Sequence, residues 1–156
     1  MKKFLILFAF IGILYSCGNN NKPDATSNSE QPKSMVSDPS SYDPHRGEGK
    51  HTTVEISEKI DDTMAETGSK IQSVKCASCH KLSDEKLVGP GWKGVTSRRK
   101  PEWIMNFMTN PDPMIDKDPA LQAQLELCLV RMPNQGLSDT DARAILEFMR
   151  KNDVAK

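Results

Sequence analysis

The sequence has few cysteines, few aromatic residues and no net charge, and each shortage excludes a class of protein. Its 156 residues include four cysteines, too few for a disulfide scaffold, so each cysteine needs its own explanation. Basic and acidic residues number 21 each, a balance that argues against a dedicated nucleic-acid binder. The length fits one domain of ordinary size with extra segments, which excludes a large two-domain enzyme.

The N-terminus reads as an export signal. Lys2 and Lys3 precede an apolar run over residues 4–14, which is too short for the roughly 20 residues that span a bilayer. The run ends at Leu14-Tyr15-Ser16-Cys17, which resembles the lipobox of bacterial lipoproteins. That resemblance implies cleavage after residue 16, a diacylglycerol on Cys17, and a lipid-anchored protein of the bacterial cell envelope facing the periplasm or exterior. An ordinary signal peptide, with Cys17 incidental, is the alternative.

The segment 17–55 is rich in Asn, Ser, Pro and Asp and nearly devoid of apolar side chains. Such a composition buries too little surface to offset its ordering entropy, so we predict a disordered tether between the lipid and the domain. We expect His45 and His51, near its end, to be solvated. The domain itself is expected over residues 56–156.

A Cys-x-x-Cys-His motif lies at Cys76-Ala77-Ser78-Cys79-His80. This is the attachment signature of c-type haem, in which two thiols bind the porphyrin vinyl groups and the histidine ligates the iron. Two alternatives use the same residues. A thioredoxin-like redox pair expects a βαβ pattern around the motif, and a zinc site would need to recruit Cys128.

Two segments have helical periodicity and flank this motif. Apolar residues recur at helical spacing over residues 60–74, with Gly68 among them. A second helix is predicted to begin at Ser138, a good N-cap residue, with acidic residues in its first turn. Gly68 and Phe148 would allow the two helices to cross closely.

Taken together, the chain from about residue 60 to 151 resembles the small monohaem class I cytochromes c. The motif at residues 76–80 is followed in order by the segments Val88-Gly89-Pro90, Arg98-Arg99 with Trp103, Asn110-Pro111, Arg131-Met132-Pro133-Asn134 and the Ser138 helix. The resemblance implies an all-α fold of about four to five helices around one covalent haem c, with the terminal helices crossed.

A methionine is the natural sixth iron ligand, since no histidine follows His80. The candidates within the domain are Met64, Met105, Met108, Met114, Met132 and Met149. Helical spacing explains most of them as packing residues, and Met114 is a weaker candidate in a turn-rich stretch. Met132 precedes Pro133 in a loop, and the family assigns the ligand to the methionine of such a Met-Pro step. We therefore predict His80 and Met132 as the axial pair.

The resemblance also implies softer roles for four residues. The Pro90 carbonyl would accept a hydrogen bond from His80 Nδ1, and Arg98, Arg99 and Trp103 would lie near the haem propionates. As alternatives, Gly89-Pro90-Gly91 is simply a turn, the arginines are a solvated charge run, and Trp103 is a core residue. Cys128 is expected to be a buried free thiol.

With both axial positions filled, the predicted function is one-electron transfer by a membrane-tethered monomer without a small-molecule substrate. Its donor would be a quinol-oxidising complex or another cytochrome, and its acceptor a terminal reductase or oxidase. The stretch from Met114 to Asn134 resembles cytochromes associated with denitrification, which favours nitrous oxide reductase. The alternative function is a haem enzyme or gas sensor with a displaceable sixth ligand.

Overall fold

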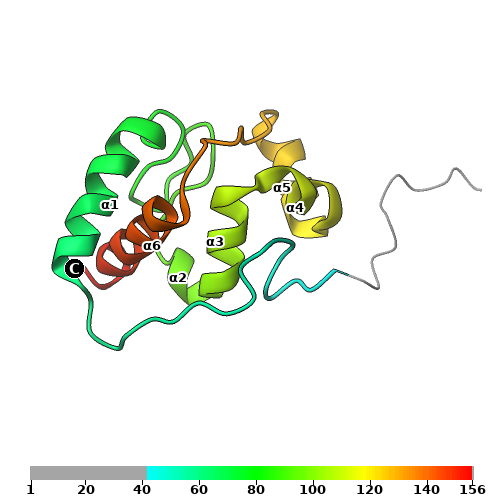
Figure 1. The fold of residues 1–156 in the computed structure, drawn as a ribbon. Coiled ribbons are helices and arrows are strands. Elements are labelled where there is room, and N and C mark those ends of the chain that lie inside the picture. Colours follow the sequence, from blue (N-terminus) through cyan, green and yellow to red (C-terminus); the bar gives the residue numbers. More distant parts are fainter. Residues whose placement is uncertain (1–41, 156) are drawn as a thin grey trace, which may run out of the picture. The chain divides into compact units, whose positions relative to one another are not determined.

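Six helices make up the regular structure of residues 42–155, the part of the chain that the computed structural model describes (Figure 1). They are α1 Asp62–Lys75, α2 Val95–Arg98, α3 Pro101–Thr109, α4 Pro111–Lys117, α5 Pro119–Cys128 and α6 Asp139–Val154. The β-type pairing in this part is limited to an isolated bridge between His80 and Lys86. The all-α prediction is confirmed. None of the helices in residues 42–155 has the length and apolarity needed to cross a bilayer.

The terminal helices α1 and α6 cross, and this is the most extensive helix–helix contact in the domain (Figure 1). Gly68 makes the close approach possible, because a Cβ added there would lie 2.0 Å from the Ala144 carbonyl oxygen. The partner of Gly68 is therefore Ala144, and the predicted Phe148 lies half-buried against the core. Val74, placed on the buried stripe by its spacing, is 82 % exposed. The helix ends just there, so the last turn has nothing to pack against.

A buried carboxylate reinforces this crossing. Glu147 on α6 is fully buried, accepts a 3.0 Å hydrogen bond from the Asp61 backbone N–H, and pairs with Arg143 and Arg150. Arg150 also donates to the Ser57 carbonyl at 2.6 Å. Burial alone would raise the pKa of Glu147, but the hydrogen bonds from Arg143, Asp61 and Arg150 outweigh it and lower that pKa. A buried charge is tolerated here because it is fully paired.

Residues 42–55, which we call the strap, run across the domain before α1 (Figure 1). Asn106 of α3, almost fully buried, accepts from the His51 N–H at 2.9 Å and donates to the Arg46 and His51 carbonyls at 3.1 and 3.0 Å. The Tyr42 hydroxyl donates to Asp118 at 2.7 Å, and the Val54 N–H donates to Glu102 at 3.0 Å. The strap is thus attached to α3 and to the start of α5.

The strap differs from the disordered tether predicted for this stretch. Its stabilisation comes from backbone groups bonded to buried side chains, a source that counting apolar residues does not detect. Gly47, with φ +72°, lies so close to Met114 that an added Cβ would be 2.4 Å from the methionine Cε. The His51 side chain, expected to be solvated, is 12 % exposed, whereas His45 is exposed as predicted.

Proline begins three successive helices, α3, α4 and α5, at Pro101, Pro111 and Pro119. Proline suits the first helical position because its missing N–H has no partner there in any case. Its effect on the preceding residue also ends the helix before it. The chain therefore turns twice within a short distance, and these turns bring α4 and α5 to the side of the domain opposite the α1–α6 crossing (Figure 1).

Candidate haem site

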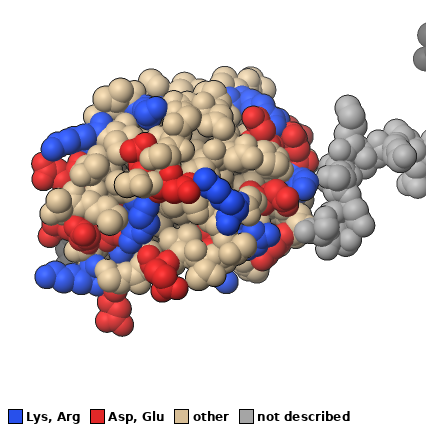
Figure 2. All heavy atoms as spheres, viewed as in Figure 1, with Lys and Arg blue, Asp and Glu red and all other residues tan. Residues whose placement is uncertain are grey.

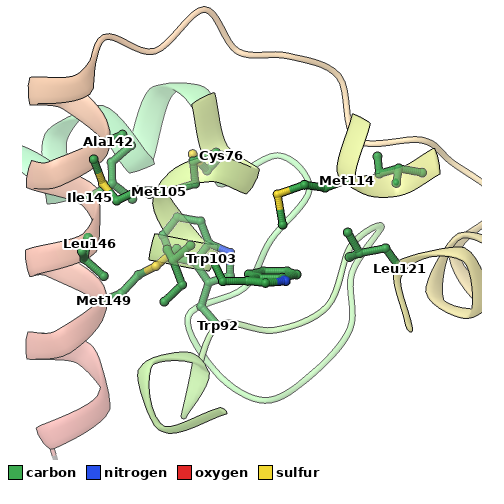
Figure 3. Close-up of a cluster of buried hydrophobic side chains, with 13 residues drawn as sticks. Cys76, Trp92, Trp103, Met105, Met114, Leu121, Ala142, Ile145, Leu146 and Met149 are labelled. Carbon is green, nitrogen blue, oxygen red and sulfur yellow. The ribbon is translucent and has the colours of Figure 1, made fainter. Parts of the chain in front are cut away.

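A cavity of about 680 Å³ opens between the helices, and residues from nearly every part of the domain line it. Its lining includes Cys76, Cys79 and His80 from the motif, Met132 from the loop before α6, and the side chains of Trp92 and Trp103. Figure 3 shows the buried side chains of α6 directed towards Met105 and Trp103, so α6 forms one wall of the core beside this space. The predicted ligand residues therefore share one cavity.

The Cys-x-x-Cys-His motif begins where α1 ends. Cys76 is the C-cap of α1, and its carbonyl accepts hydrogen bonds from the Cys79 and His80 N–H groups at 3.0 and 2.9 Å. This tight turn brings both sulfurs and the imidazole to one side of the cavity. Burial raises the pKa of the Cys76 thiol to about 11, so the thiol stays protonated at neutral pH.

His80 is oriented by its own loop. Its Nδ1 lies 2.8 Å from the Pro90 carbonyl oxygen, the pairing that the family resemblance implied. Burial lowers the pKa of His80, and the Pro90 bond only partly opposes that effect, so the ring is neutral and Nε2 keeps its lone pair for a metal. Gly89 packs against the ring, since a Cβ added there would be 2.4 Å from His80 Cε1.

Trp92 is a site residue that the sequence did not single out. It is buried, lines the cavity, and its ring centroid lies 5.8 Å from that of His80. Its N–H donates to the Lys81 carbonyl at 2.9 Å, which closes the loop that carries His80. Its position two residues after Pro90 was the available signal, because a residue so near the Pro90–His80 bond must lie close to the ligand.

Three of the six candidate methionines line the cavity: Met108, Met132 and Met149. Met108 and Met149 are buried on helices, whereas Met132 is half-buried in the loop between α5 and α6. Met114, the weaker alternative, does not line the cavity; it is fully buried beneath the strap and extends towards Trp103 (Figure 3). Loop placement thus continues to favour Met132.

Arg98, Arg99 and Trp103 all line the cavity, as predicted for residues near the propionates. The Arg99 guanidinium lies 4.2 Å from the Trp103 ring centroid, a cation–π contact, while Arg98 donates to the Lys93 carbonyl at 2.8 Å. The Trp103 indole N–H, however, donates to Asp118 at 3.3 Å. Contact with a propionate therefore stays a prediction for these three residues, and the indole donor already has a partner.

Asp118 was also missed by sequence reasoning. It is 2 % exposed, caps α5 through the Ala120 N–H at 2.8 Å, and receives both Trp103 and Tyr42. Burial, together with the hydrogen bond to Asp118, raises the pKa of Tyr42, so the phenol remains a donor. An Asp before a proline is a common helix cap, and the sequence gives no sign that the same carboxylate collects two aromatic donors.

The other two cysteines have different outcomes. Cys128, expected to be buried, is half-buried at the end of α5 and lines the cavity, because the exposed Leu127 and Leu129 flank it. Cys17, the predicted lipidation site, lies outside the described residues. No group of three His, Cys, Asp or Glu side chains in residues 42–155 is arranged to hold a metal ion, so the zinc alternative gains no support.

Charge is mixed on the outer surface. On the face shown in Figure 2, acidic and basic side chains are interspersed. Several of these are paired, as in Lys151–Asp62 at 2.8 Å and Lys81–Glu85 at 2.7 Å. The balance of 21 basic and 21 acidic residues is thus mirrored locally on this face, and no extended patch of one sign forms there.

Comparisons with known proteins agree on one family. The family model for cytochrome c matches residues 65–153. The solved structure of cytochrome c from Rhodothermus marinus is 37 % identical, with a TM-score of 0.65 over 67 % of this chain and 90 % of that one. An engineered form of that protein bound to a carbene intermediate is 37 % identical, with a TM-score of 0.62 and the same coverage. A comparison with curated proteins gave no match.

Proposed function

This chain belongs to the cytochrome c family, carrying covalent haem c and transferring electrons, and on that premise we propose how its residues hold the haem. Cys76 and Cys79 form the two thioether bonds, and His80 and Met132 are the axial ligands of the iron. The observation that supports this most strongly is that all four residues line one cavity of about 680 Å³.

The residues present fit such a group. The lining combines two thiols, a neutral imidazole and a thioether with aromatic side chains, and Arg98 and Arg99 lie at the same cavity as partners for propionates. Haem supplies an iron that changes its charge by one electron. The chain's own part is to orient His80 through Pro90 and to exclude water with the tryptophans. With nitrogen and sulfur ligands in both axial positions, no position is left for a substrate, which favours electron transfer over catalysis.

We further propose that Cys17 is lipidated and tethers the domain to a membrane of the bacterial cell envelope. The support is the Leu14-Tyr15-Ser16-Cys17 sequence after a short apolar run. The carrier, acting as a monomer, receives electrons from a quinol-oxidising complex or another cytochrome. It delivers them to a terminal reductase, with nitrous oxide reductase favoured by the stretch from Met114 to Asn134, or else to an oxidase.

Paired variants test the ligand assignment. In Met132→Leu, the low-spin spectrum of the oxidised protein should lose its methionine–iron charge-transfer band and the reduction potential should fall. Met108→Leu is the matched control, since Met108 lines the same cavity and the swap conserves volume. Retention of the band in Met132→Leu, or its loss in Met108→Leu, would contradict the assignment.

Haem attachment has its own test. Cys76→Ala with Cys79→Ala should remove haem from the chain on a denaturing gel, whereas Cys128→Ala should leave it attached, although Cys128 lines the same cavity. Haem that stays on the double variant would overturn the thioether assignment.

One observation keeps the alternative function in view. The engineered relative is bound to a carbene intermediate, so that protein admits a small molecule to its cavity. A displaceable Met132 would give this chain a related enzymatic or gas-binding role. Rapid binding of carbon monoxide to the reduced wild-type protein would favour that role, and slow or negligible binding would favour the electron carrier.

A further inference from the structure

The loop that carries Met132 has weak intrinsic support. It spans residues 129–138 between α5 and α6, and its residues 130–137 form no backbone–backbone hydrogen bond. Its attachments to the helices are made by side chains. Lys75 Nζ donates to the Gln135 carbonyl at 2.9 Å, and the Asn134 amide donates to the Thr109 carbonyl at 3.3 Å. These bonds lie two or three residues after Met132.

The attachment next to Met132 is Arg131. Its Nε donates to Asp112 Oδ1 at 2.8 Å, and one terminal nitrogen donates to Asp116 Oδ1 at 2.8 Å and to the Asp112 carbonyl at 3.1 Å. Asp112 and Asp116 lie one turn apart on α4, so they present two carboxylates to one planar guanidinium. Three bonds from one side chain fix its position more closely than a single ion pair does.

The receiving helix is firmly held. Pro111, Met114 and Ile115 of α4 are buried in the core, and Met114 packs under the strap at Gly47. The two acids therefore stand on a fixed support, and the flexible partner in the contact is the loop. Releasing Arg131 frees the residue adjacent to Met132 and leaves α4 in place.

From this geometry we infer that Arg131 is a positioning residue, which holds Met132 at the cavity and sets how readily the sixth iron ligand is displaced. The inference rests on the proposed ligation by Met132. Arg131 does not touch the iron; it acts through the backbone that it shares with the ligand. Because the three side chains are 40–64 % exposed, the contribution is modest. A network of exposed charges contributes up to about 1 kcal/mol, or roughly a fivefold change in an equilibrium constant.

Imidazole titration of the oxidised holoprotein measures this directly, with loss of the methionine–iron charge-transfer band as the readout. In Arg131→Gln, half-displacement should need roughly fivefold less imidazole than in the wild type. Asp112→Asn with Asp116→Asn should give a similar shift, although both substitutions are on α4 and distant in sequence from the ligand. Combining all three should add little, because the same bonds are removed. Arg131→Lys, which keeps the charge but not the fork, should fall between.

Lys151→Gln is the matched control, since it removes another exposed ion pair, to Asp62, that joins α6 to α1. It should leave the titration unchanged. Equal titrations for Arg131→Gln and the wild type, or fully additive effects of the arginine and aspartate changes, would overturn the role of Arg131 alone. A wild-type spectrum without the charge-transfer band would instead overturn methionine ligation, and this inference with it.

Discussion

The two segments that carry the candidate iron ligands are held in opposite ways. Residues 76–93, with His80, are bonded backbone to backbone: His80 to Cys76, Gly89 to Cys79 and Trp92 to Lys81, each at 2.9 Å. Residues 130–137, with Met132, have no such bonds and depend on side chains from neighbouring helices. Backbone bonds survive most substitutions, whereas side-chain attachments can be changed one at a time. One side of the site is therefore built for permanence and the other for adjustment.

The largest effect should come from crowding the His80 side. Gly89→Ala places a Cβ 2.4 Å from His80 Cε1 inside a loop that the backbone bonds prevent from moving. We expect most covalent haem incorporation to be lost and stability to fall by about 3 kcal/mol, measured by haem yield and urea unfolding.

Gly136→Ala is the counterpart on the Met132 side. Gly136 has φ +60° but nothing within 4 Å of an added Cβ, so the expected cost is about 1 kcal/mol of backbone strain with normal haem yield. Equal losses from the two substitutions would remove the contrast between the two sides.

The next effect concerns the frame that both sides share. Glu147→Gln removes the buried charge that ties α6 to the start of α1, and it leaves Arg143 and Arg150 without their partner. Stability at neutral pH should fall by about 3 kcal/mol in urea unfolding. Hydrogen exchange should increase to the same extent in both ligand segments, because neither is attached to Glu147 alone. A loss of protection confined to one segment would contradict this.

The same variant has a defined pH dependence. Since the folded-state pKa of Glu147 is lowered from about 4.5, its contribution is present above that value and is lost as the pH falls through the lower folded pKa. The stability difference between the wild type and Glu147→Gln should therefore be largest near neutral pH and shrink on acidification. A constant difference down to pH 2 would show that packing, and not charge, is responsible.

The smallest change should stabilise the Met132 side. Leu129 ends α5 in the left-handed conformation, φ 58°, while its side chain is 85 % exposed. Leu129→Gly removes strain without loss of packing, and after the entropy cost of glycine we expect a gain of about 0.5 kcal/mol in urea unfolding. Leu127→Gly, the same change inside the helix, should cost about 1 kcal/mol. A loss at both positions would mean that Leu129 is not strained.

The sequence was most informative where chemistry demands fixed spacing. Cys76, Cys79 and His80 follow from a motif, and the Ser138 cap follows from local helix rules, so both were predictable. Asp118 and Trp92 were not, because their roles depend on contacts between segments far apart, such as Tyr42 with Asp118. The strap failed for a related reason. Its bonds are donated and accepted by backbone atoms, which every sequence has, and only the position of Asn106 reveals that they have partners.

The strap also changes how the domain bears a mechanical load. Because Arg46 and His51 are bonded to Asn106 of α3, and Tyr42 to Asp118, tension arriving from the N-terminal side passes into α3 and the start of α5. It bypasses α1, whose last residue precedes Cys76. The strap therefore acts as strain relief, in the sense that a cable clamp protects a soldered joint: a pull on the chain is taken up before it reaches the residues that hold the haem.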